Sequence, residues 1–325
     1  MNMAWYIGRR FIWALIATVI ILTVTFLLMA ASPNPETSTI AFEAAQAGYD
    51  VDEAVELHEA QRGEDRALFE QYVDFMVSMF TLDWGNSFTY NTDVMSVIAN
   101  AWVYSAMVVI PGTILAVVLG FGIGLYSATN QYTKTDYAAT FFAFFGISLP
   151  NFWFAIILIL VFGVWFGVLP ISYNTDNPMF SMANVANLIL PITVLATAAI
   201  ASEMRYARAE ALEYVRAEFV KTARAKGISE RRVMIRHIFR PAMVPLITIL
   251  IGDLVGIIFA STYIIEVIFG IPGLGLVSYN ALIRFDTPVV LATTLIPVFI
   301  AVLGNLAQDI AYTMLDPRID YGGRQ

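Results

Sequence analysis

Long runs of apolar residues without a charge constrain this 325-residue chain more than any other feature. A helix needs about 20 apolar residues to cross the roughly 30 Å hydrocarbon core of a bilayer. The candidate stretches are 11–31, 101–128, 138–171, 186–202, 242–265 and 289–308. Only 242–265 contains a charge, Asp253. Because lone strands cannot satisfy their backbone polar groups in lipid, we expect six transmembrane helices, with Pro150 starting or kinking a helix in the third stretch.

Composition excludes the other broad classes. Hydrophobic residues make up 58% of the chain and charged residues 14%, against about 25% charged residues in ordinary soluble domains. So few polar side chains cannot cover a soluble domain of this size, and so apolar a chain is not disordered. The absence of cysteine from the sequence excludes disulfides, thiolate zinc sites and iron–sulfur clusters. The sequence therefore predicts an all-α polytopic membrane protein.

The distribution of charge predicts the orientation of the chain. Arg9 and Arg10 precede the first apolar run, and residues 203–240 contain ten basic and five acidic residues. Residues 32–100 contain 13 acidic and two basic residues. Because short cytoplasmic loops are rich in Lys and Arg, we expect cytoplasmic termini, 203–240 inside and 32–100 outside. An alternative is a signal peptide starting at Arg9–Arg10, but signal cores span roughly 7–15 residues, which favours an uncleaved first span.

The segment 203–240 predicts two helices joined by a glycine turn. Its first half has an apolar stripe at helical spacing, made of Leu212, Val215, Phe219 and Thr222 or Ala223. Gly227 is a candidate C-terminal cap, and Ser229 is a candidate N-terminal cap for the second helix. Three interpretations are open: a loop whose charges only set topology, a DNA-binding helix-turn-helix, or a docking site for a cytoplasmic partner. A position between two membrane spans disfavours the DNA-binding interpretation.

The run FVKTARAKGISERR at 219–232 resembles the cytoplasmic EAA loop of ABC-importer permeases, and most closely that of the dipeptide/oligopeptide/nickel permease family. Other pieces resemble the family's motifs in the family's order: LDWGNS at 82–87, ISLPNFW at 147–153, FGIPGLG at 269–275, Asn305–Leu306 and LDPR at 315–318. Together these matches run from residue 5 to residue 321. Residues 32–64 match poorly, and Lys221-Thr222-Ala223 stands where the general loop has Glu-Ala-Ala, which resembles the peptide branch.

This resemblance implies a type I ABC-importer permease fold that forms half of a translocation pore for peptides or similar small polar solutes. The implied partners are a second permease subunit, which would make a heterodimer, two cytoplasmic ATPase subunits, an extracytoplasmic solute-binding protein and the lipid bilayer. The implied organisation is a cytoplasmic N-terminus and first helix at 1–31, an acidic outer loop at 32–100, a five-helix core at 101–316 and a cytoplasmic tail at 317–325. The residues implied to couple the chain to the ATPases are Thr222, Ala223, Arg224, Lys226, Gly227, Ile228 and Arg231.

A few residues inside or near the spans are candidates for other roles. Asp253 lies near the middle of the fifth span, where a carboxylate is expensive in lipid, so it should face the interior, either on the solute path or bonded to another helix. Glu266 and Asp309 lie near span ends, and interhelical hydrogen bonds are expected there. Glycines four residues apart predict close helix packing at Gly120/Gly124, Gly163/Gly167 and Gly252/Gly256.

Two other function classes fit the sequence less well. A membrane-embedded enzyme is disfavoured because His58 and His237 are expected on opposite sides of the membrane, which leaves no shared metal site. A secondary transporter or channel working without an ATPase is the alternative function, but mid-span charges are nearly absent and no inverted repeat is evident. The sequence contains no Gly-Lys pair and hence no P-loop, so ATP must be used by a partner. We expect no catalytic residue, metal or cofactor in the chain, and no nucleic-acid partner.

Overall fold

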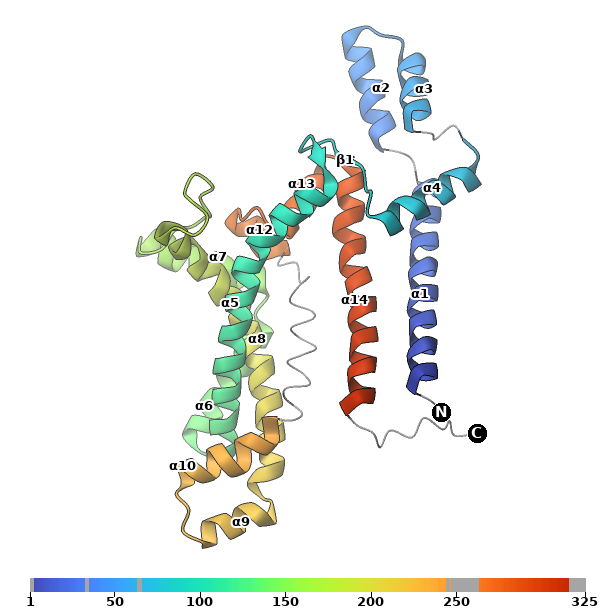
Figure 1. The fold of residues 1–325 in the computed structure, drawn as a ribbon. Helices are drawn as coiled ribbons and strands as arrows, with labels where there is room; N and C mark the ends of the chain where they lie inside the picture. Colours follow the sequence, from blue (N-terminus) through green and yellow to red (C-terminus); the bar gives the residue numbers. More distant parts are fainter. Residues whose placement is uncertain (1–2, 33–34, 63–65, 244–245, 247–262, 316–325) are drawn as a thin grey trace. The chain divides into compact units, whose positions relative to one another are not determined.

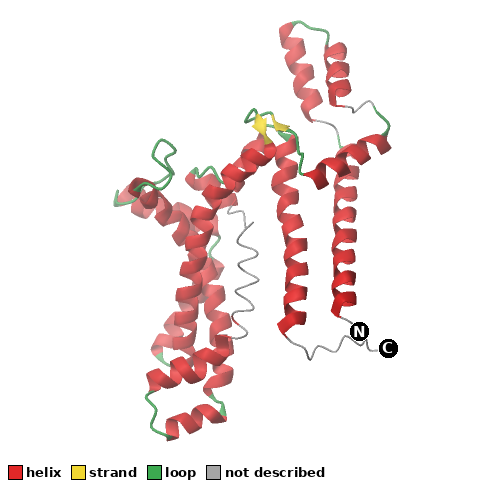
Figure 2. Cartoon of the chain, viewed as in Figure 1, coloured by secondary structure: helices red, strands yellow, loops and turns green. Residues whose placement is uncertain are grey.

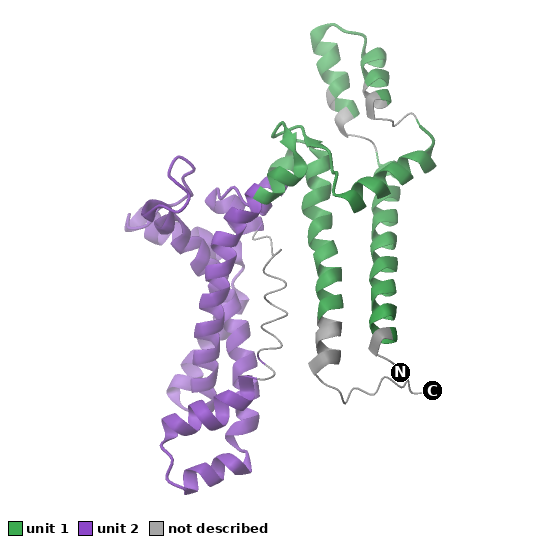
Figure 3. Ribbon diagram, viewed as in Figure 1, with its two compact units in different colours: residues 1–99, 280–325 green, residues 100–279 purple. Residues whose placement is uncertain are grey.

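A computed structural model describes residues 3–32, 35–62, 66–243, 246 and 263–315. The described chain is helical apart from one two-stranded hairpin (Figure 2). It forms two compact units, residues 1–99 with 280–325 and residues 100–279 (Figure 3). Asp253 and the Gly252/Gly256 pair lie outside the described residues, as does most of the predicted span 242–265, and so does the side chain of Asp309.

The first unit contains two long apolar helices that run side by side, α1 (Met3–Ala31) and α14 (Thr287–Leu315) (Figure 1). A shorter helix, α4 (Leu68–Thr81), packs on α1. The ring of Phe26 in α1 lies 5.3 Å from that of Tyr72, and the Tyr72 hydroxyl shares a 2.8 Å hydrogen bond with Thr23 Oγ1. This contact holds part of the acidic segment against the first membrane helix.

The rest of the acidic segment is also structured. It contains two helices, α2 (Pro35–Ala47) and α3 (Val51–Arg62), which pack together as a hairpin (Figure 1). Farther along the chain, β1 (Asn86–Ser87) pairs antiparallel with β2 (Thr92–Asp93). The segment is therefore a set of short elements and not an open loop.

The second unit is built around two long helices, α5 (Val94–Thr129), most of which lies in this unit, and α8 (Met182–Val215). A Cβ added at Gly120 would lie 2.5 Å from Glu203 Cβ, and one at Gly124 would lie 2.5 Å from the carbonyl oxygen of Met204. Both glycines therefore let α5 approach the backbone of α8, and the packing predicted for this pair is confirmed.

Two helix pairs are sharply bent. α6 (Lys134–Ser148) is followed by α7 (Asn151–Leu158), which continues as the π-helix η1 (Ile159–Trp165), and the bend between α6 and the second part is 104°. The break falls at Leu149–Pro150, as expected for a proline that starts a helix. α12 (Tyr263–Phe269) and α13 (Leu274–Ile283) are bent by 83°. Within the described residues, four helices are long and apolar enough to span a membrane, or up to six if each bent pair is one span.

The packing predicted for Gly163/Gly167 is wrong. A Cβ at Gly163 would lie 2.3 Å from the side chain of Ile171, in the segment that folds back after η1. Gly167 lies beyond the end of η1 with a φ of +61°, and a Cβ there would meet no neighbour within 4 Å. Because η1 ends between Gly163 and Gly167, the two glycines lie at a reversal of the chain and not on one face of a helix.

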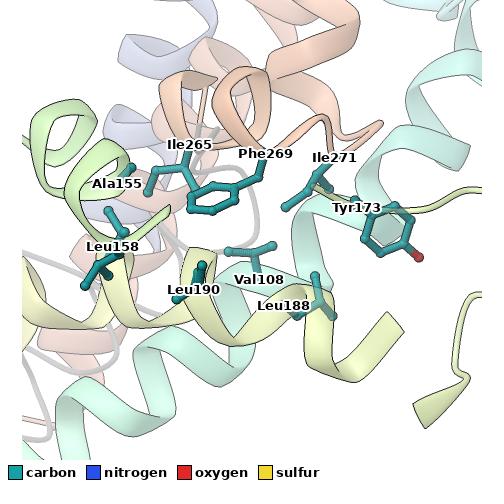
Figure 4. Packing of buried hydrophobic residues seen from close by; sticks show 10 residues of the cluster. Val108, Ala155, Leu158, Tyr173, Leu188, Leu190, Ile265, Phe269 and Ile271 are labelled. Carbon is teal, nitrogen blue, oxygen red and sulfur yellow. The ribbon is translucent and has the colours of Figure 1, made fainter. Parts of the chain in front are cut away.

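A buried apolar cluster organises one end of the second unit (Figure 4). Its members come from α5, α7, α8, α12 and the segments that follow η1 and α12: Val108, Ala155, Leu158, Tyr173, Leu188, Leu190, Val194, Ile265, Phe269 and Ile271. The backbone N–H of Tyr173 donates to the Phe269 carbonyl at 2.8 Å, and Asn184 Nδ2 donates to the Tyr173 hydroxyl at 3.0 Å. Burial raises the pKa of the Tyr173 hydroxyl above its usual value, helped by the nearby Tyr104. The cluster thus holds the segment that follows η1, which contains Tyr173, against α12.

Candidate functional site

The segment singled out by the sequence forms a short helix, a tight turn and a second helical stretch. These are α9 (Glu218–Ala225), α10 (Glu230–Arg232) and the π-helix η2 (Val233–Phe239), which continues directly from α10 (Figure 1). Before them α8 extends to Val215, well beyond the predicted apolar run that ended at residue 202. The predicted pair of helices with a glycine between them is confirmed.

The apolar stripe predicted along this segment is partly wrong. Phe219 is 47% exposed, whereas Val220 is fully buried and Ala223 is 4% exposed. The chain leaves helical geometry between α8 and α9, where Ala217 is extended with a ψ of 144°. This break changes the phase of α9 relative to α8, so a single helical period does not run through both.

A small apolar core seats α9 on the longer helices. It contains Leu125 and Ala128 of α5, Ala211 of α8, Val220 and Ala223 of α9, and Val233 and Ile238 of η2. Leu212, Val215 and Ile228 pack against it. α9 is therefore part of a packed unit and is not a free loop.

The turn at Gly227 is a Schellman motif. Gly227 has a φ of +73°, its N–H donates to the Arg224 carbonyl at 2.9 Å, and the Ile228 N–H donates to the Ala223 carbonyl at 3.3 Å. These are the two hydrogen bonds that close such a motif, and they confirm the predicted cap. Ser229 occupies the N-cap position of α10, but its side chain makes no capping hydrogen bond, so that part of the prediction is wrong.

Ion pairs brace the two sides of the turn. Arg224 Nε donates to Glu230 Oε1 at 2.9 Å, and Arg224 Nη2 donates to Oε2 at 3.3 Å. On α9 itself Lys221 Nζ lies 2.7 Å from Glu218 Oε1. The two-point Arg224–Glu230 pair links α9 to α10 across the turn.

The structure separates the predicted coupling residues into three groups. Thr222, Lys226 and Arg231 are exposed, so they are available to a partner. Ala223 is buried and Ile228 is half-buried, so they hold the segment's own fold. Arg224 and Gly227 shape the turn. Whether these residues couple to an ATPase stays a prediction.

An ion pair that the sequence did not suggest lies close to this segment. Asp136 of α6 is 2% exposed and receives Arg208 of α8 in a two-point contact, with Nε–Oδ1 and Nη2–Oδ2 distances of 3.1 Å. Ser127 Oγ of α5 and the Tyr132 N–H also donate to this carboxylate. The sequence signal near this pair is Thr133, a residue type that is common at the start of a helix. Thr133 caps α6 by accepting a hydrogen bond from the Asp136 N–H at 3.3 Å. The cluster ties α5, α6 and α8 together beside the core under α9.

Glu266 confirms the expected interhelical hydrogen bond. Its buried carboxylate accepts from Ser105 Oγ of α5 at 2.7 Å and from the Gly275 N–H of α13 at 2.6 Å. The carboxylate thus caps the N-terminus of α13, where negative charge is favoured. A Cβ at Gly273 or Gly275 would lie 2.5 or 2.9 Å from Glu266 Oε2, which explains these two glycines of the motif at 269–275.

A comparable anchor lies in the first unit. Asp286, at the start of α14, accepts from Ser87 Oγ at 2.6 Å and from the Thr89 N–H at 2.9 Å. The nearby Trp84 packs edge-on against Phe299 of α14, with ring centroids 6.3 Å apart. The motif at 82–87 therefore docks the β1–β2 hairpin onto α14. Across the described residues, no group of three or more His, Cys, Asp or Glu could hold a metal ion.

Comparison with known proteins adds independent information. A family model described as "binding-protein-dependent transport system inner membrane component" matches residues 120–321. The chain is 35% identical to the oligopeptide transport system permease protein AppB of Bacillus subtilis strain 168, over 98% of this chain and all of that protein. It is 34% identical to the oligopeptide permease OppB of Haemophilus influenzae, over 97% of this chain and 99% of that protein. It is 32% identical to the dipeptide permease DppB of Bacillus subtilis, over 98% of each. The family match contains α9, the Gly227 turn and the Asp136–Arg208 pair.

Proposed function

Because the chain belongs to the family of binding-protein-dependent transport system inner membrane components, we propose that α9 couples it to separate ATPase subunits. The chain is the permease subunit of such a system and a multi-pass membrane protein. The permease contributes half of a translocation pore, and a partner hydrolyses ATP. In this proposal the chain itself has no catalytic role.

One observation carries the coupling proposal: α9 has an exposed, largely polar face and a buried face in an apolar core that it shares with η2, α5 and α8. A partner that binds the exposed face can therefore move two membrane helices at once. Thr222, Lys226 and Arg231 would contact the partner, and Ala223 with Ile228 would transmit the displacement. Alternating access in such bundles is largely a rigid-body motion, which needs a firm attachment of this kind.

The solute class is proposed from the relatives. AppB and OppB are named as oligopeptide permeases and DppB as a dipeptide permease, so we infer that the solute here is a peptide or a similar small polar molecule. An extracytoplasmic binding protein would deliver it. Asp253 remains the candidate residue of the translocation path from the sequence.

The orientation is proposed from the charge pattern. Both termini and residues 203–240 face the cytoplasm, and the acidic segment 32–100 faces outside, since the basic residues gather on one set of loops. The five-helix core spans 101–316, and 317–325 forms the tail. The pore is completed by a second, different permease subunit. In the second unit, the exposed Phe141 and Phe145 of α6 stack with centroids 6.2 Å apart and offer an apolar surface to lipid or that subunit.

The coupling proposal is tested by reversing charge on the exposed side of the segment. Lys226→Glu combined with Arg231→Glu should reduce co-purification of the ATPase subunits and ATP-driven peptide uptake, with normal levels of permease in the membrane. Lys134→Glu, at an exposed site at the start of α6, is the matched control. Normal uptake and normal co-purification in the double variant would overturn the proposal. Uptake in vesicles that contain no ATPase would support a secondary transporter instead.

A further inference from the structure

A groove of about 740 Å³ runs along η2, next to α9. Its lining contains the basic residues Arg232, Arg236 and Arg240 and the apolar residues Ile235, Phe239 and Met243, together with Ser229 and Arg231 at its end near α9 and the turn. Each set recurs every four residues, so the two form neighbouring rows along the same helical stretch. The groove therefore combines a row of positive charge with a row of apolar surface.

The arginines of this groove differ from those that hold the fold. Arg208 and Arg224 each bind a carboxylate. Among the described residues, no ion pair joins Arg232, Arg236 or Arg240 to an acidic side chain, and all three are exposed. The lining contains no acidic residue to balance them. Uncompensated guanidinium groups at close spacing favour binding of phosphate.

The position of the groove beside a predicted membrane span favours a lipid as the phosphate-bearing ligand. Met243, at one end, belongs to the apolar run 242–265 that the sequence identifies as a membrane span. Arg240 and Phe239 lie directly before it, where a chain entering the bilayer passes the headgroups. Ile235 is 51% exposed, which is unfavourable in water and favourable against acyl chains.

We propose that this groove binds an anionic phospholipid. The headgroup phosphate lies against Arg232, Arg236 and Arg240, and the acyl chains follow the row of Ile235, Phe239 and Met243. An acidic segment of a partner protein would match the charge but not the apolar row that leads into the membrane span. The site is next to the coupling segment, so a bound lipid would stabilise the position of η2 and thereby of α9.

Native mass spectrometry of the full-length permease in neutral detergent tests the site without ATPase subunits or transport. Phosphatidylglycerol is titrated against phosphatidylcholine with the same acyl chains. We expect preferential retention of phosphatidylglycerol. A basic residue near an anionic membrane contributes about 1 kcal/mol, or roughly fivefold, so Arg232→Gln, Arg236→Gln and Arg240→Gln together should weaken phosphatidylglycerol binding by about 100-fold.

Two further variants make the result decisive. A control with Lys134→Gln, Arg205→Gln and Arg284→Gln removes the same charge elsewhere and should bind lipid as the wild type does. The Arg→Lys triple variant at 232, 236 and 240 keeps the charge and should retain most of the binding, and this separates loss of the site from loss of the fold. Equal retention of both lipids by the wild type, or an unchanged affinity in the Gln triple variant, would overturn the proposal. Co-purification of the ATPase subunits with the Gln triple variant is measured separately. If this variant binds lipid as the wild type does but no longer co-purifies with the ATPase subunits, the groove is assigned to a protein partner.

Discussion

Arg224 and Glu230 form a two-point ion pair across the Gly227 turn, with distances of 2.9 and 3.3 Å. The side chains are 36% and 71% exposed, and exposed pairs contribute about 0–1 kcal/mol to stability. The pair therefore contributes little to the free energy of folding, although it links α9 to α10. The positive φ of Gly227 makes the turn between them possible.

Replacing Gly227 with valine should abolish ATP-driven uptake while the protein still inserts in the membrane. The left-handed backbone at this position costs a non-glycine residue about 1–2 kcal/mol, and a β-branched residue is the least tolerant. A Cβ there would meet no atom within 4 Å, so the effect is conformational and not steric. Gly227→Asn is the matched control because Asn tolerates this geometry. Uptake assays beside immunoblots of membranes measure it, and wild-type uptake by the valine variant would contradict the prediction.

Removing Arg208 should destabilise the second unit. Arg208→Met leaves the buried Asp136 carboxylate without its cation, and breaking a buried pair from one side costs about 3–5 kcal/mol, less here because Arg208 is 28% exposed. The double variant Arg208→Met with Asp136→Asn should recover part of the loss, since the uncompensated charge is gone. Thermal unfolding of the purified protein in detergent measures both. Equal stability of the single variant and the wild type would show that the pair contributes little.

Gly275→Ala should destabilise the junction of α12 and α13. The added Cβ would lie 2.4 Å from Tyr263 Cα and 2.9 Å from Glu266 Oε2, and backbone cannot move aside as a side chain can. Gly122→Ala is the control, because a Cβ there meets nothing within 4 Å, and alanine in a helix is favoured by about 0.5–1 kcal/mol. Lower thermal stability in the first variant with equal or higher stability in the second is the expected outcome. The same loss in both would point to a general effect of replacing glycine.

Asp286→Ala should release the β1–β2 hairpin from α14. Ser87 Oγ and the Thr89 N–H would lose their acceptor, which costs about 1–3 kcal/mol for buried groups. Cleavage between residues 85 and 93 in limited proteolysis should become faster. Asp83→Ala, at an exposed site on the same segment, should leave the cleavage rate unchanged. An unchanged rate in the Asp286 variant would mean that Trp84 and Phe299 hold the hairpin without it.

The parts of the fold that follow from local pattern were predictable, and those that depend on distant contacts were not. Uninterrupted apolar runs predict α1, α5, α8 and α14 because a membrane span needs length and apolarity alone. The Gly227 turn was predictable because a positive φ selects glycine.

The features that the sequence did not predict depend on a local break in helical geometry or on contacts between residues far apart in the chain. A single helical period through α8 and α9 places Phe219 on the buried face, because such a period does not register the one extended residue, Ala217, before α9. Asp136 and Arg208 are far apart in the sequence, and only the packing of α6 on α8 brings them together. Pro150 indicates a helix start in the sequence, but the residue type alone does not give the 104° bend found there.

The tight fit of α5 on α8 has a mechanical consequence. With Gly120 and Gly124 against the backbone of α8, sliding one helix along the other would drive carbonyl and Cβ atoms into each other, so shear between them is resisted. We therefore expect α5 and α8 to move together as one rigid body. In the coupling proposed above, a displacement of α9 would move α5 and α8 together, and relative motion would be expected at the bends of 104° and 83°.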